Sequence, residues 1–122
     1  MAFTGTATVK QISDRLVRIT GLSLASAASG VIVPFGAVSP PAGSVVLPQS
    51  FHPQTYAYGT GTVTLQDCIE VTAEPAATGV ATAIPVSTVK TGTTVADFAA
   101  TLTNTHGSLA TPALEIIVRN HE

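Results

Sequence analysis

Short stretches of alternating hydrophobic and polar residues dominate the chain. Residues 3–10 alternate small or hydrophobic residues with threonine and lysine, and this period of two is typical of a half-buried strand. After a turn at Ser13-Asp14, Arg15–Thr20 places Val17 and Ile19 on one face of a second strand. We therefore expect the first two strands to form a hairpin.

The same pattern predicts strands later in the chain, separated by turns. Gly21–Gly30 is rich in Ser, Ala and Gly, which predicts a loop or a β-bend. The closing stretch places Leu114, Ile116 and Val118 on one face, as expected for a half-buried strand. Further strands are expected at Val31–Val33, which Pro34 ends, at Val45–Leu47, and within Val80–Val89, which Pro85 interrupts; turns are expected at Glu74–Gly79, Lys90–Thr93 and Asn104–Gly107.

Two stretches permit alternative interpretations. Thr55–Thr72 alternates over a long distance, but Asp67 interrupts its hydrophobic face, so we expect either a bulge near Asp67-Cys68 or two strands with a break. Thr94–Thr103 fits a helix, because Thr94 and Asp97 are spaced like a capping box, and it also fits a strand. We favour the strand, because threonine is a poor residue for a helix interior.

Together these elements predict an all-β fold. The chain has 122 residues, which is enough for one domain with a modest core and too short for two. About eight short strands with turn signals between them predict a single-domain β-sandwich or jelly-roll-like barrel over residues 1–122. At most one short helix is expected, in Ala25–Ser29 or in Val95–Thr103.

Residues 34–61 form a Pro- and aromatic-rich extended segment that differs from the rest of the chain. The segment holds five of the eight prolines and no charged residue. Structureless loops of this length are uncommon in compact domains unless they have a function. We therefore predict contact with a partner, and the alternative is that the aromatic rings cover one end of the core. The predicted contact residues are Phe35, Phe51, His52, Tyr56 and Tyr58.

Composition and charge limit the classes of partner. Charged residues are 10% of the chain, against about 25% in an average soluble domain, whereas there are 19 Thr and 9 Ser. Five Lys and Arg against seven Asp and Glu give a net charge of −2, which excludes a basic patch for nucleic acid. No apolar run approaches the ~18 residues of a membrane span, and we expect no membrane partner.

The low charge also bears on oligomeric state and location. With a mean hydropathy of +0.43, few polar side chains are left to cover a monomer, so we expect a homo-oligomer. The first ten residues lack the basic and apolar regions of a secretion signal, and we expect synthesis in the cytoplasm.

The chemically active residues do not form a recognisable set. The histidines have no His, Cys or carboxylate at a metal-ligand spacing, and we expect His52, His106 and His121 in turns or at the terminus. Cys68 is expected to be a small buried hydrophobic residue. We therefore expect no enzyme activity, no metal and no cofactor. Paired carboxylates stay open, because four residues could converge without their spacing requiring it: Asp67, Glu70, Glu74 and Asp97.

Two stretches resemble a known class of viral protein. Arg18–Ile32, which reads RITGLSLASAASGVI, and Leu114–Arg119, which reads LEIIVR, resemble small tailed-bacteriophage head proteins of the decoration or cement type. The resemblance implies a β-sandwich or jelly-roll-like domain, without enzymatic activity, on the outside of an assembled capsid. It implies the major capsid protein and further copies of the chain as partners, with a homotrimer as the expected state and the virion exterior as the location.

The second functional class is a carbohydrate-binding or adhesion module of a tail or fibre, with the aromatic residues as a sugar platform. Sugar sites usually combine an aromatic ring with several polar side chains. Residues 34–61 offer only Gln49, Gln54 and His52 for that role, which favours a protein partner. An enzyme is the least supported of the three classes.

Overall fold

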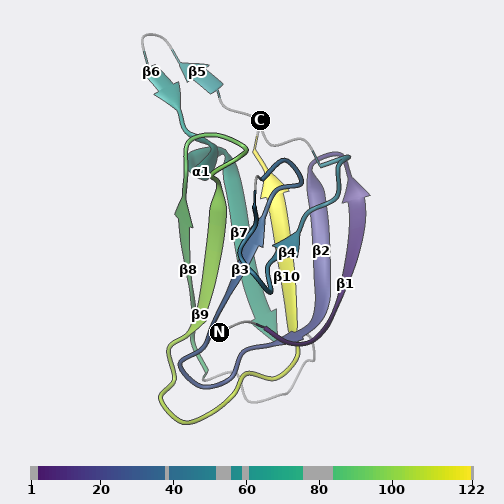
Figure 1. Cartoon of the computed structure of the whole chain (residues 1–122), viewed down its shortest axis with the longest axis vertical. Helices are drawn as coiled ribbons and strands as arrows, with labels where there is room; N and C mark the ends of the chain where they lie inside the picture. Colours follow the sequence, from purple (N-terminus) through teal and green to yellow (C-terminus); the bar gives the residue numbers. More distant parts are fainter. Residues whose placement is uncertain (1–2, 38, 52–55, 59–60, 76–83, 122) are drawn as a thin grey trace.

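A computed structural model places the chain in two four-stranded sheets (Figure 1). It describes residues 3–37, 39–51, 56–58, 61–75 and 84–121, with the backbone alone for 56–58, 61–63 and 75. Sheet A has the order β1 (Thr4–Ser13), β2 (Leu16–Ser23), β10 (Leu114–Asn120) and β7 (Ile69–Pro75). Sheet B has the order β4 (Val45–Val46), β3 (Ser29–Val33), β9 (Ala99–Asn104) and β8 (Val86–Thr91).

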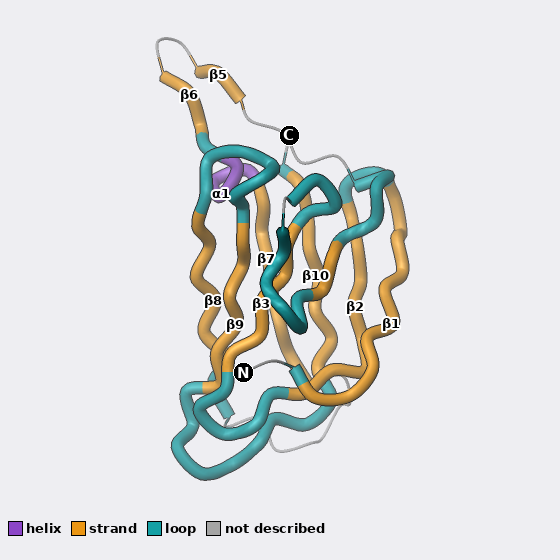
Figure 2. The backbone as a smooth tube through the Cα atoms, in the orientation of Figure 1, coloured by secondary structure: helices purple, strands orange, loops and turns teal. Residues whose placement is uncertain are grey.

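The remaining elements are small. Strands β5 (Tyr56–Tyr58) and β6 (Gly61–Val63) pair with each other, and α1 (Leu65–Cys68) is one helical turn (Figure 2). All strand pairs are antiparallel except β3 with β4. The prediction of an all-β domain is confirmed, whereas the jelly-roll-like connectivity stays a prediction. Among the described residues, no helix is long and apolar enough to cross a membrane.

The first two strands form the predicted hairpin. Asp14 and Arg15 make the turn, and Val17 and Ile19 are fully buried on the inner face of sheet A. Both ends of β1 carry a register shift against β2, and near the first shift Gly5 has a φ of 90°. Few residues other than glycine adopt this backbone conformation, so the irregularity at the start of β1 is built into the sequence.

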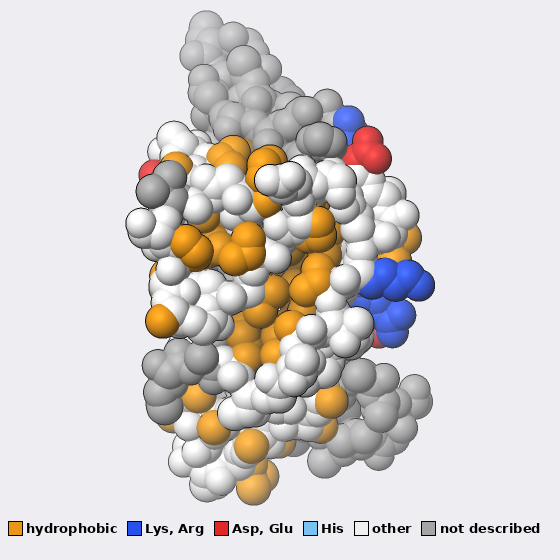
Figure 3. Space-filling model, turned by 45° about the vertical axis from the view of Figure 1, so that its right-hand side comes forward, with side chains coloured by type: hydrophobic (Ala, Val, Ile, Leu, Met, Phe, Trp, Pro, Cys, Tyr) orange, Lys and Arg blue, Asp and Glu red, His pale blue; other side chains and the backbone are white. Residues whose placement is uncertain are grey.

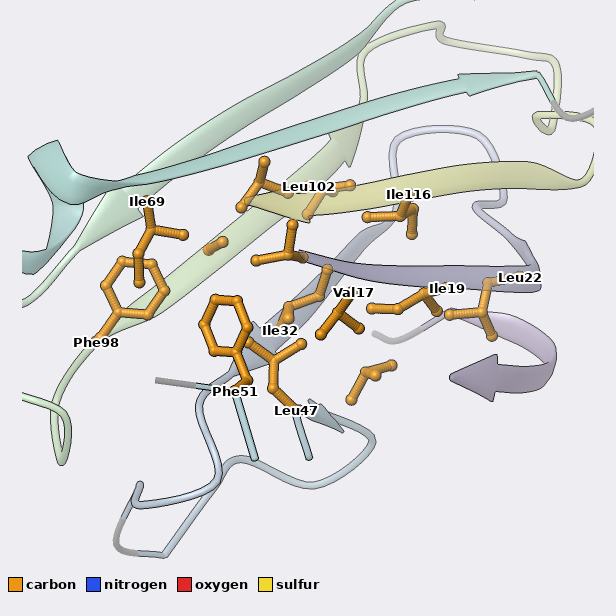
Figure 4. Packing of buried hydrophobic residues seen from close by; sticks show 14 of the residues in the cluster. Val17, Ile19, Leu22, Ile32, Leu47, Phe51, Ile69, Phe98, Leu102 and Ile116 are labelled. Carbon is orange, nitrogen blue, oxygen red and sulfur yellow. The ribbon is translucent and has the colours of Figure 1, made fainter. Parts of the chain in front are cut away.

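The core lies between the two sheets and takes residues from both. Ile116 and Val118 of β10 face inward, as their alternation predicted, and so do Ala100 and Leu102 of β9. Figure 4 shows the hydrophobic side chains of the two sheets meeting in one cluster. Alternation alone therefore assigned the inner faces of β2 and β10, because every second residue of a strand points to the same side.

The break inside Thr55–Thr72 is a helical turn. Strand β6 ends at Val63 and β7 begins at Ile69, which confirms two strands with a break and shows that the expected bulge was wrong. The turn between them buries Leu65 and Cys68, which are three residues apart, and leaves Asp67 exposed. The only helix of the described residues is therefore α1, outside the two ranges in which a helix was expected.

The stretch Thr94–Thr103 contains both predicted features, one after the other. Residues 95–97 form a turn in which Asp97 binds the backbone of Thr93 and Thr94, and β9 begins only at Ala99. The strand prediction was correct for the second half and wrong for the first. One of the two hydrogen bonds of a capping box, from the Thr94 amide to the Asp97 carboxylate, occurs here without a helix, and Phe98 is buried in the core.

A buried polar residue fixes the loops at the end opposite α1. The Asn104 side chain is fully buried and donates to the carbonyl oxygens of Leu24, Ala25 and Leu109. Its own carbonyl oxygen accepts from the amide of His106. The sequence indicated only a turn at this position, because a single asparagine gives no sign that its side chain will join two loops.

Candidate interaction surface

The Pro- and aromatic-rich segment divides into two parts with different environments. The first part, residues 34–51, returns to the body of the sandwich and contributes β4, which pairs with β3. The amide of Leu47 donates to the carbonyl oxygen of Val33, and Leu47 and Phe51 are both buried in the core. We refer to residues 34–51 as the inner part of the segment.

Phe51 lies in the core. Its side chain has 0% exposure and points into the cluster shared by the two sheets (Figure 4). Of the two alternatives for the aromatic rings, Phe51 follows the one in which the ring covers the core. A fully buried ring offers no surface to a partner. Phe35 differs, since 37% of it is exposed after the end of β3.

The second part contains the hairpin of β5 and β6, which we call the arm. In its register Tyr56 lies opposite Val63, and Tyr58 lies opposite Gly61. The arm extends beyond the end of the sandwich, roughly along the direction of the strands (Figures 1 and 2). Tyr56 and Tyr58 are thus placed on an element whose sheet contains no strand of the main body. His52 lies outside the described residues.

The remaining candidates for chemistry have separate partners. The Nδ1 atom of His106 accepts from the amides of Ser108 and Leu109, at 3.1 and 3.0 Å, within a loop. His121 lies 2.6 Å from a carboxylate oxygen of Glu70, and both side chains are about half exposed. Cys68 is buried, as predicted. Among the hydrogen bonds of the described side chains, that of His121 with Glu70 is the one that pairs a histidine with a carboxylate, and this pair lies exposed at the surface.

The four carboxylates considered for acid and base catalysis also lie in different settings. Asp67 accepts from the Thr64 hydroxyl at 2.8 Å, and Glu70 contacts His121. Asp97 accepts from the Thr93 and Thr94 amides, and the hydrogen bond from the Thr94 backbone is the main reason that the pKa of Asp97 is lowered. In residues for which the structure gives side chains, no group of three His, Cys, Asp or Glu could hold a metal ion.

The outer faces of the two sheets differ in charge. Sheet A displays charges of both signs on its outer face, and Arg18 and Glu115 form an ion pair there with a distance of 2.7 Å. The strand registers place no Lys, Arg, Asp or Glu on the outer face of sheet B. In the view of Figure 3 the blue Lys and Arg atoms lie along the right-hand margin. The charged residues on the outer face of sheet A are Lys10, Arg18, Glu70, Glu74, Glu115 and Arg119.

The described residues thus offer surfaces for contact and no enclosed site. No pocket was found in the described part of the chain. Comparison with family models, with curated proteins and with solved structures found no match to the chain. The candidate functional features are therefore the arm, Phe35 and the contrast in charge between the two sheet faces.

Proposed function

We propose that the protein is a structural component of a virus particle, which binds the outside of an assembled bacteriophage head and stabilises it. The observation that carries the proposal is the arm, an uncharged hairpin that extends from a β-sandwich whose described part holds no pocket. A contact made by such an element desolvates no charge, and the prolines before it reduce the entropy lost on ordering.

The arm supports a bridging role. Because it extends beyond the sandwich, it would contact one capsid subunit while the body of the protein rests on another. Binding to the assembled shell alone stabilises the shell by mass action, without a change in the fold of either partner. The proposed contact residues are Phe35, His52, Tyr56 and Tyr58.

The homotrimer belongs to the same proposal. The accessible surface of the chain is 6379 Å², close to the roughly 6100 Å² expected for a compact monomer of this mass. Hydroxyl groups of Ser and Thr take the place of charges on much of this surface. The trimer is therefore supported by the resemblance to decoration proteins alone.

A carbohydrate-binding module is less well supported. Sugar sites are usually concave and combine an aromatic ring with several polar side chains. The inner part of the segment has one amide side chain, that of Gln49. Its Phe51 is buried in the core, where the ring cannot stack on a sugar.

Binding to heads assembled without the chain tests the proposal. The purified protein should sediment with the heads at a saturating ratio and should raise the temperature at which they disrupt. Tyr58→Ala should weaken binding about tenfold, as expected for a central aromatic contact. Leu109→Ala is the matched control, because Leu109 is a hydrophobic residue with 54% exposure at the other end of the sandwich. Failure of the wild-type protein to bind heads would reject the proposal.

A further inference from the structure

The outer face of sheet B carries no charged residue in the described part of the chain. In the register of its strands, Val31 lies opposite Thr101, and Thr101 lies opposite Val89. One row further along, the hydroxyls of Ser29 and Thr103 are 2.7 Å apart and satisfy each other. The face consists of Ser29 and Val31 of β3, Val46 of β4, Ser87, Val89 and Thr91 of β8, and Ala99, Thr101 and Thr103 of β9.

The outer face of sheet B lacks charged residues, whereas the outer face of sheet A carries several. Six of the twelve Lys, Arg, Asp and Glu residues lie on the outer face of sheet A. Lys90 belongs to β8, yet it lies opposite the buried Ala100 and its ammonium group donates to the carbonyl oxygen of Ile69. The one cation of sheet B is therefore used inside the molecule, between β8 and β7. Covering the outer face of sheet B would desolvate hydroxyl and methyl groups and no ion.

The size of this face argues against a stable pair of chains held by it alone. Three strands spaced by about 4.8 Å, each about 20 Å long, cover roughly 300 Å² in projection. A stable interface buries about 800 Å² on each partner, so the face needs a second contact that acts together with it. The arm supplies that contact in our proposal, because in the view of Figure 1 it extends beyond the end of the sandwich, roughly along the strand direction.

We propose that the protein lies flat on the shell, with the outer face of sheet B against one capsid subunit and the arm reaching along the shell to the next. The charged face of sheet A then points to solvent. This inference rests on the proposed function and adds an orientation to it. The alternative orientation, in which the sandwich stands on its arm end and both faces remain in water, is an outcome of the test.

Matched charge substitutions on the two faces provide the test. The double variant Ser87→Lys and Val89→Lys adds two cations to the outer face of sheet B, at positions that are both exposed. The double variant Thr8→Lys and Thr72→Lys adds the same charge to the outer face of sheet A, at two exposed threonines. Both variants should keep the far-UV circular dichroism spectrum of the wild type, because none of the four side chains is buried.

Binding to heads assembled without the chain is then compared. We expect the sheet B variant to lose at least about tenfold in affinity, because it buries unpaired charge, while the sheet A variant stays within about twofold of the wild type. Equal binding by both variants, or a larger loss for the sheet A variant, would overturn the orientation and leave the proposed function in place. No binding by the wild type would overturn both.

Two further measurements keep the result unambiguous. Sedimentation of the free protein shows whether the sheet B variant changes self-association; if it does, the face lies between copies of the chain and the inference is wrong. A cryo-electron microscopy map of decorated heads reports the orientation without any substitution. Sheet B should lie toward the shell, and a map with sheet A toward the shell would contradict the proposal.

Discussion

The inner part of the Pro- and aromatic-rich segment and the arm both lack charged residues, but they occupy different positions in the molecule. Residues 34–51 bring Leu47 and Phe51 into the core, where both side chains are almost fully buried. The arm pairs only within itself, and its sheet contains no strand of the sandwich. Composition therefore indicated that the whole segment was unusual, whereas the fold separates a part that stabilises the sandwich from a part that is available to a partner.

The largest effect expected from this comparison is that of Phe51→Ala. Removal of a fully buried phenylalanine creates a cavity, and it should lower the free energy of unfolding by about 3–5 kcal/mol. Urea denaturation followed by circular dichroism measures this change. A loss below about 1 kcal/mol would mean that the inner part contributes little to the core, and the contrast between the two parts would disappear.

Gly36→Ala is expected to have a smaller effect on the same inner part. A Cβ atom at residue 36 would lie 2.6 Å from Cγ1 of Val95, in the turn before β9. Valine is short and stiff, so the neighbouring backbone has to shift, at a cost of about 1–2 kcal/mol. Combining Gly36→Ala with Val95→Ala should recover part of the loss in a double-mutant cycle, because the second substitution removes the atom in the way. Strictly additive effects would show that the two residues do not touch.

The long strands and Phe51 show what the sequence could and could not predict. The alternation of β1, β2 and β10 assigned their inner faces correctly, because the period of a strand is local. The position of Phe51 depends on how a loop of many residues returns to the sheets, and no local pattern encodes that path. The same limit applies to Asn104, whose side chain binds carbonyl groups from a loop 79 and 80 residues away.

The candidate surface was predictable in part. The absence of charge in residues 34–61 was evident from the sequence, and it directed attention to the segment that contains the arm. The uncharged face of sheet B was not evident, because its residues come from four separate strands and become one surface only through their register. The inward position of Lys90 shows the same point, since its neighbours in the sequence, Val89 and Thr91, face outward.

The turn that packs beside Gly36 should respond to acid. Hydrogen bonds from Thr94 and Thr93 stabilise the ionised Asp97 carboxylate, and they lower the pKa of Asp97 below its ordinary value of 3.8. The contribution of Asp97 to stability is therefore complete above pH 3.8, and it declines as the pH falls toward the lowered pKa of the folded state. Asp97 is exposed, so the effect should be small.

Asp97→Asn should be less stable than the wild type at pH 6, and the difference should narrow as the pH falls below 3.8. Thermal unfolding at several pH values measures this difference. Glu74→Gln is a suitable control, because it removes one negative charge from an exposed strand position. A difference between Asp97→Asn and the wild type that does not change with pH would show that ionisation of Asp97 does not contribute.

The smallest effect on stability is expected in the arm, and it provides the sharpest contrast with Phe51. The arm is paired only within its own hairpin, so the double variant Tyr56→Ala and Tyr58→Ala should change the free energy of unfolding by less than about 0.5 kcal/mol. The same variant should weaken head binding at least as much as Tyr58→Ala alone, because both tyrosines are proposed contacts. If it instead unfolded the protein as readily as Phe51→Ala, the tyrosines would be part of the core. The two parts of the segment would then share one structural role, and the partner contact would have to be sought on the face of sheet B alone.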